Sequence, residues 1–188
     1  MKLLIKIYIP EVNPYDLTQI LDVLNSSISD KENTKIHITS NDTNFEFDPY
    51  EYSYLSDLSI PKMINYNLYD LEWDIVLPIF RPCIESRGFD VIIKNFYGEK
   101  FPSLDGVLLL NDGTKNIYPV IGRKYFEKFG YIYNPAYVKN NYEEEFIEVL
   151  NQSNKSYVFD KVIFNTLILK SDDDNIYEMR KKLNFGLK

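Results

Sequence analysis

The start of the chain alternates between apolar strand and amphipathic helix, and this order constrains the fold more than any other sequence feature. Ile5–Ile9 has the alternation of a first strand. Asn13 and Pro14 follow, an N-cap residue and a proline at the first helical position. Apolar residues then recur at helical spacing over residues 14–28, and Lys35–Thr39 has the pattern of a second strand. Strand, helix, strand is the opening of an α/β sheet.

The rest of the chain continues this alternation after a weakly patterned stretch. Residues 40–72 are rich in Tyr, Asp, Asn and Ser, and we expect an irregular insertion or lid with one short helix. Apolar runs and helical periodicities predict the later elements: strands at Trp73–Phe80, Asp105–Leu110 and Tyr157–Leu169, and helices at Gly88–Tyr97, Arg123–Phe129, Tyr142–Gln152 and Asp172–Leu183. The order predicts one domain over residues 1–188, with a central mixed sheet flanked by helices.

Charge and composition exclude several classes of function. A net charge of -7 argues against nucleic-acid binding by phosphate neutralisation. One cysteine (Cys83) and one histidine (His37) cannot form an internal disulfide or a Cys/His zinc site. No stretch approaches the roughly 18 apolar residues of a membrane span, and the N-terminus lacks the features of a signal peptide. We therefore expect a cytoplasmic protein without a membrane span.

Several short motifs follow one another between Gly88 and Leu150. Gly-Phe-Asp opens a helix, Phe-Pro-Ser-Leu-Asp-Gly-Val leads into a strand, and Asn-Asp-Gly ends that strand. Pro-Val-Ile-Gly-Arg-Lys-Tyr-Phe, Phe-Gly-Tyr-Ile-Tyr-Asn-Pro-Ala-Tyr and an acidic Glu-Glu-Glu-Phe come next. In this order they resemble small inverting nucleotide-sugar glycosyltransferases, often from phages or bacteria, with a single Rossmann-like domain of GT-A type. The resemblance covers roughly residues 73–188.

This resemblance implies an α/β fold of GT-A type and the transfer of a sugar from a nucleoside diphosphate. Negative charge grows on the departing diphosphate, a metal held by carboxylates usually offsets it, and a carboxylate near the acceptor takes a proton. The resemblance places Asp112, Glu143 and Glu145 on the acceptor side as catalytic candidates. It places Asn41 and Asp42 in the loop that holds the uracil and ribose.

The sequence departs from the family pattern at three points of one site. Where the metal-binding acids should end a strand, it has Arg81 and Pro82, neither of which can ligate a metal. The His-x-His-Pro element expected after residue 164 and the Pro-Ser-Arg-like nucleotide loop expected near residue 10 are both missing. We therefore expect no metal and no cofactor other than a nucleotide-sugar substrate. Arg81, assisted by Arg123, would then pair directly with a diphosphate.

Two functions of different class stay open. The absence of three family motifs from one site favours a glycosyltransferase-like domain without metal-dependent catalysis. It would serve as a binding or assembly subunit with a protein partner or a second copy, for example in a phage particle, in the host cytoplasm or the virion. The alternative is an active nucleotide-sugar transferase that uses arginine in place of the metal. An open cleft at the carboxyl ends of the strands, lined by Arg81 and Asp112, would favour catalysis. A cleft filled by Phe80, Pro82 and tyrosines, with an apolar patch elsewhere, would favour assembly.

Each candidate residue also has a purely structural explanation. Asp112 stands in an Asn-Asp-Gly turn, where its tolerance of unusual dihedrals is sufficient reason for it. The acidic run at 143–145 suits the first turn of a helix, and so does the run at 172–174. Arg81 has the alternative of a surface ion pair.

Overall fold

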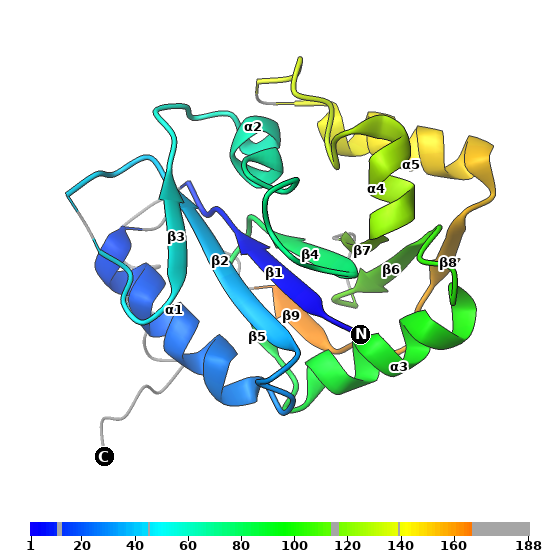
Figure 1. The fold of residues 1–188 in the computed structure, drawn as a ribbon, viewed down its shortest axis with the longest axis horizontal. Coiled ribbons are helices and arrows are strands. Elements are labelled where there is room, and N and C mark those ends of the chain that lie inside the picture. Colours follow the sequence, from blue (N-terminus) through cyan, green and yellow to red (C-terminus); the bar gives the residue numbers. More distant parts are fainter. Residues whose placement is uncertain (11–12, 45, 114–116, 139, 167–188) are drawn as a thin grey trace.

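The two central strands of the fold are β1 (Leu3–Ile7) and β4 (Ile75–Ile79), which pair in parallel with one another. The structure is a computed structural model, and it describes residues 1–10, 13–44, 46–113, 117–138 and 140–166 (Figure 1). Within these residues the strands form a seven-stranded mixed sheet in the order β3-β2-β1-β4-β7-β6-β8. The other five strands are β2 (Thr34–Ser40), β3 (Glu51–Tyr54), β6 (Val107–Asn111), β7 (Ile117–Gly122) and β8 (Ser156–Val158).

The order of the strands reverses between β1 and β4. From β1 the chain passes through α1 (Pro14–Ser27) to β2 and then to β3, which lie on one side of β1. It then returns through α2 (Ile60–Asn65) to β4, on the other side of β1. All four strands are parallel, so their carboxyl ends meet at one edge. Open α/β sheets bind ligands in the crevice at such a reversal.

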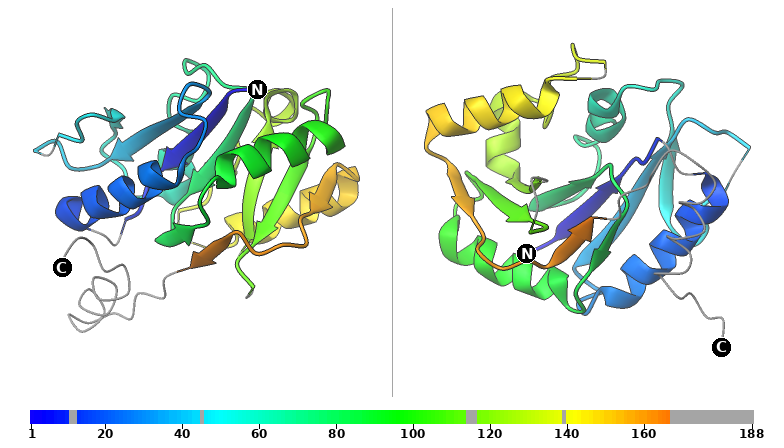
Figure 2. Two further views of the ribbon diagram at one scale, coloured as in Figure 1. Left: turned by 90° about the horizontal axis from the view of Figure 1, so that it is seen from below. Right: turned by 180° about the vertical axis from the view of Figure 1, so that it is seen from behind.

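Each face of the sheet carries its own apolar core, because successive side chains of a strand point to opposite faces. On one face, Ile5 and Ile38 pack with α1 and α3 (Phe89–Lys100). On the other face, Leu4 and Val76 pack with α2, α4 (Arg123–Phe129) and α5 (Tyr142–Ser153). Figure 2 shows these two layers of helices from below and from behind. A second small sheet, β5 (Cys83–Glu85) with β9 (Phe164–Thr166), lies between α1 and α3.

The helices predicted at 14–28 and 123–129 are confirmed, and so are the residues that were expected to begin the first and to end the second. The side chain of Asn13 accepts a hydrogen bond of 3.0 Å from the backbone N–H of Asp16, and Pro14 begins α1. Gly130 has φ 77° and ends α4 in the left-handed conformation that glycine tolerates. None of the helices among the described residues is long and apolar enough to cross a membrane.

Three strands, β3, β5 and β7, were not predicted from the sequence, and the expectation of mostly strand over Tyr157–Leu169 is wrong. In the structure β8 ends at Val158 and pairs with β6, whereas β9 begins at Phe164 and pairs with β5 in the other sheet. The intervening residues carry the chain from one sheet to the other. Short strands of this kind depend on the partners that the fold supplies. The helix expected at Asp172–Leu183 lies outside the described residues.

The stretch at 40–72 contains both β3 and α2. The expected single short helix is confirmed as α2. The strand β3 pairs in parallel with β2, from His37↔Glu51 to Ser40↔Tyr54, and extends the sheet. Its sequence, Glu-Tyr-Ser-Tyr, has no alternation of apolar residues that would have marked it. The role of this stretch as a lid stays a prediction.

A buried lysine ties three strands together on the face that α2 covers. Lys6 is fully buried, and its Nζ lies 2.9 Å from Nδ1 of His37 on β2. The other ring nitrogen of His37 lies 3.1 Å from Oγ of Ser53 on β3. Burial lowers the pKa of Lys6 to about 7. Burial and the neighbouring lysine lower the pKa of His37 to about 4, so the imidazole is uncharged at neutral pH and accepts from Lys6.

Lys6 makes the stability of the protein depend on pH above neutrality. Its pKa falls from 10.5 to about 7 on folding, so the folded chain binds fewer protons than the unfolded chain between these values. The free energy of unfolding therefore rises with pH across this window, by at most about 5 kcal/mol. We expect Lys6→Met to flatten this rise in denaturant titrations from pH 6.5 to 9.5. An equal slope in both proteins would contradict the assignment.

Candidate functional site

One pocket opens where the carboxyl ends of β1 and β2 meet, and we call it the β1–β2 pocket. Its volume is about 380 Å³. It is lined by the residues that follow the two strands, together with one side chain from α1: Tyr8–Pro10, Leu17, Thr39–Asn44 and Phe47. The pocket therefore lies at the strand reversal, where the topology predicts a ligand.

The loop that forms one wall of the β1–β2 pocket carries Asn41 and Asp42. Its shape is held by local hydrogen bonds, because Asp42 N–H donates to Oγ of Ser40 at 3.0 Å and Oδ1 of Asp42 accepts from Asn44 N–H at 2.9 Å. Asn41 is exposed and Asp42 half-buried. The structure thus places both candidates of the predicted nucleotide loop in one pocket.

Two hydroxyl groups among the residues of this pocket have no hydrogen-bond partner within the described residues. They are the hydroxyls of Tyr8 and Thr39, whose side chains are 2% and 1% exposed. An unpartnered buried hydroxyl costs free energy, and native proteins contain few of them. A ligand or water that reaches these groups would recover that cost. Sequence reasoning missed both residues, since each closes an apolar strand and resembles ordinary core.

Arg81 lies just past the end of β4, at the same edge of the sheet as this pocket but not among the residues that line it. Two residues before it, the carbonyl of Ile79 accepts a 3.0 Å hydrogen bond from Tyr8 N–H, and neighbouring strands lie only about 4.8 Å apart. The guanidinium lies over the ring of Phe80, 4.4 Å from its centroid, and donates through Nη2 to Oε2 of Glu143. Burial by itself would lower the pKa of Arg81. The hydrogen bond and the negative charge of the Glu143 carboxylate more than offset this effect, so the pKa of Arg81 is raised.

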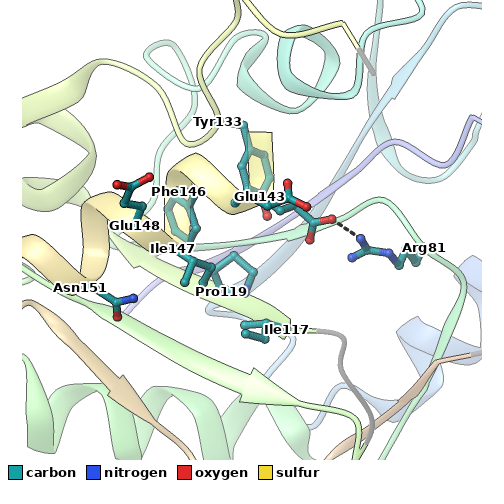
Figure 3. Close-up of a pocket in the computed structure, with 10 residues that line it drawn as sticks. Arg81, Ile117, Pro119, Tyr133, Glu143, Phe146, Ile147, Glu148 and Asn151 are labelled. Atoms are coloured by element: carbon teal, nitrogen blue, oxygen red, sulfur yellow. Dashed lines mark hydrogen bonds and ion pairs between the residues drawn. The ribbon is translucent and has the colours of Figure 1, made fainter. Parts of the chain in front are cut away.

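Another pocket is lined by Arg81 and by residues of α5, and we call it the α5 pocket. Its volume is about 520 Å³. Figure 3 shows Arg81 and Glu143 joined at one end of it, with apolar side chains from β7 and α5 along it. The lining combines one cation, three carboxylates, an amide and an apolar floor: Arg81, Ile117, Pro119, Tyr133, Glu143, Glu144, Phe146, Ile147, Glu148 and Asn151. The pocket is open and lined by Arg81, but Asp112, which the sequence interpretation also expected there, is not among its lining residues.

The two predicted glutamates of α5 face different surroundings. Residues two apart on a helix lie about 200° apart around its axis. Glu143 therefore lines the α5 pocket, whereas Glu145 accepts a 3.1 Å hydrogen bond from Nδ2 of Asn134 and lines a small separate cavity. The structure brings Glu143 to Arg81 and leaves Glu145 outside the α5 pocket.

Asp112 lies at the same edge of the sheet, but below the surface. It follows β6, is 6% exposed, and is not among the residues that line the α5 pocket. Close to it, the thiol of Cys83 donates to Oε1 of Glu85 at 3.1 Å. Burial, then Glu85 and finally Asp112 raise the pKa of Cys83 well above its usual value, and burial raises the pKa of Glu85 to about 7. The expectation that Cys83 is buried is confirmed.

Arg123 lies at the opposite end of β4 from Arg81. Its backbone N–H donates to the carbonyl of Asp74 at 2.8 Å, just before the strand begins. The length of β4, about 16 Å, separates it from the two pockets. Its guanidinium lies over the ring of Trp73 at 4.7 Å and donates to Glu127 and to three carbonyls. The structure therefore does not bring Arg123 to the site where the sequence interpretation expected it.

The residues at the end of β4 do not fit the metal that such a fold usually holds. Arg81 and Pro82 supply no oxygen ligand there. Across the described part of the chain, no group of three or more His, Cys, Asp and Glu side chains is arranged to hold a metal ion. We derive no chemical step through a metal.

The contacts of Arg123 predict a purely structural effect. We expect Arg123→Ala to lower the free energy of unfolding by about 1–3 kcal/mol, because the substitution removes a cation–π contact and leaves carbonyls of the 68–71 turn without a donor. Thermal and denaturant unfolding measure this loss. No change in stability would show that these contacts are too exposed to matter.

Comparison with known proteins bears on the fold. No family model matches the sequence, and no curated protein matches it. Solved structures do match. The crystal structure of S. aureus TarS 1-349 in complex with UDP has a TM-score of 0.68 and 15% identity, covering 100% of this chain and 67% of that chain. TarS 1-349 in complex with UDP-GlcNAc has a TM-score of 0.66 and 15% identity, covering 100% and 68%.

A third solved structure matches along almost its whole length. CMP:2-keto-3-deoxy-manno-octonic acid synthetase complexed with CTP has a TM-score of 0.55 and 11% identity, covering 99% of each chain. The present chain spans about two thirds of TarS 1-349 and only 41% of the longer TarS chain. At these identities the likeness shows the fold alone. The α/β fold of GT-A type that the resemblance implied is confirmed, and the three structures of this fold are complexes with UDP, UDP-GlcNAc and CTP.

Proposed function

We propose that this chain binds a nucleoside diphosphate sugar across the reversal between β1 and β4 and transfers the sugar, with Arg81 in the place of a metal. The position of Arg81 carries the proposal. It follows β4 at the strand reversal and lines an open pocket that suits an acceptor, while a polar pocket that suits a nucleoside opens at the same edge of the sheet. The open α5 pocket supports this function over a filled cleft.

The donor would place its nucleoside in the β1–β2 pocket. Support comes from the unpartnered hydroxyls of Tyr8 and Thr39 and from the polar loop with Asn41 and Asp42. Structures of the same fold hold UDP, UDP-GlcNAc or CTP. The diphosphate would then reach the guanidinium of Arg81, whose paired N–H groups match two phosphate oxygens.

Transfer would use Glu143 as the base. Its carboxylate takes the proton of an acceptor hydroxyl bound in the α5 pocket. The acceptor oxygen forms a bond to the anomeric carbon, and the bond between that carbon and the diphosphate oxygen breaks. Its electron pair leaves with the diphosphate, and Arg81 offsets the new charge. Asp112 and Glu145 are not part of this step, because neither lines the α5 pocket.

A binding or assembly subunit without catalysis is the second candidate. One edge of the sheet favours it, because β8 pairs only with β6 among the described strands and carries the exposed side chains Tyr157 and Val158. A protein partner or second copy, a phage origin, and a cytoplasmic or virion location belong to this candidate.

Calorimetric titration with UDP, GDP and their sugars, with and without manganese, tests the proposal. We expect binding without metal, and a loss of tenfold or more in Arg81→Ala, since a charged hydrogen-bonding partner is worth about 1.5–3 kcal/mol. Arg123→Ala is the matched control, an arginine of the same sheet that should leave the affinity unchanged.

Other outcomes of this titration are equally informative. Binding that requires manganese would overturn the role of Arg81 and reveal a ligand set that the described residues do not supply. If no nucleotide binds, the proposal fails and the assembly subunit stands.

Thr39→Val tests the β1–β2 pocket, because the substitution should lower the affinity for UDP without lowering the stability of the protein. The substitution removes a hydroxyl that has no partner among the residues that the structure describes, and it keeps the shape of the side chain. We expect the free energy of unfolding to stay equal or rise, and the affinity for UDP to fall about two- to tenfold, as expected for one lost hydrogen bond. Unchanged affinity would place the nucleoside elsewhere.

A further inference from the structure

We infer that Arg81 exchanges partners when a donor binds, from the Glu143 carboxylate to the diphosphate, so that Glu143 becomes free to act as a base only in the donor complex. The inference rests on the proposed function and adds an order of events to it. Without a ligand, the group that would stabilise the leaving diphosphate and the group that would take the acceptor's proton neutralise each other.

The ion pair is accessible to a ligand. It joins residues 62 positions apart in the sequence, one after β4 and one in the first turn of α5. The side chains of Arg81 and Glu143 are 29% and 32% exposed, and both line the α5 pocket. A phosphate oxygen can therefore replace the carboxylate without any opening of the core.

The packing around the pair fixes the arginine and leaves the glutamate free to turn. Arg81 lies over Phe80, and that ring is held edge-on by Tyr133 at 5.6 Å and Tyr142 at 6.0 Å between centroids. The guanidinium is thus positioned by three packed aromatic rings. Among the described residues, the side chain of Glu143 makes no hydrogen bond other than the one with Arg81, so it can rotate into the pocket once Arg81 has a new partner.

Charge makes the exchange favourable for a diphosphate. A carboxylate carries one negative charge, whereas a diphosphate presents several oxygens and at least two charges to the same guanidinium. The released carboxylate would then lie in a pocket that already holds Glu144 and Glu148. Donor binding would in this way prepare the base.

The exchange has a measurable cost, because the donor must displace Glu143 before it can bind. Glu143→Gln should therefore bind UDP more tightly than the native chain. The gain expected for a partly exposed ion pair is about three- to fivefold. A glutamate that only shapes the helix would not produce a gain of this size.

Matched variants distinguish the exchange of partners at Arg81 from general charge repulsion between the glutamates and UDP. Glu144→Gln removes the same charge from the same pocket, from a residue that has no ion pair with Arg81. We expect it to change the UDP affinity by less than half as much. In an Arg81→Ala background, Glu143→Gln should bring no gain. Circular dichroism spectra check that all variants are folded.

The outcomes distinguish this inference from the proposed function. A gain confined to Glu143→Gln and dependent on Arg81 supports the exchange. Equal gains in Glu143→Gln and Glu144→Gln, or a loss in Glu143→Gln, overturn it while donor binding stands. If UDP binds neither the native chain nor any variant, the proposed function and the exchange both fail.

Discussion

The parallel pairing of β1 with both of its neighbours is the constraint on which the rest of the structure depends. Leu3–Ile7 pairs residue for residue with Thr34–Ile38 on one side and with Ile75–Ile79 on the other. Because the register is the same on both sides, the carboxyl ends of the three strands lie at the same edge of the sheet. Segments that are far apart in sequence, with Pro10, Asn41 and Arg81, therefore meet at one edge.

At that edge, in the function that we propose, Arg81 would supply the positive charge that a metal would otherwise give. The protein as a whole is acidic, so an anionic ligand meets an unfavourable overall field and depends on local positive charge. Arg81 is prepared for this by its position over Phe80 and by the Glu143 carboxylate that keeps it ionised. An ion pair at a half-exposed site adds little to the free energy of unfolding, so we relate this pair to ligand binding and not to stability.

Much of the fold could be predicted from local pattern, and part of the site could not. The cap at Asn13 and the glycine end at Gly130 mark α1 and α4 because capping is a local interaction between residues a few positions apart. The resemblance pointed to Arg81 and Glu143, which the structure brings together. It also pointed to Arg123, which the structure places at the far end of β4. Nothing in the sequence around an arginine states which end of a strand it will face.

By itself, the sequence determined the alternation of strands and helices, the residue types at the end of β4 and the absence of carboxylates there. These are properties of neighbouring residues, and local geometry expresses them. Only the tertiary structure decided that Glu143 and not Glu145 faces Arg81, and that Asp112 is buried beside Cys83. It also decided that the hydroxyls of Tyr8 and Thr39 find no partner within the described part of the chain. The reason is physical. The rotation of a helix and the pairing of short strands are set by packing against distant segments, and no local pattern records them.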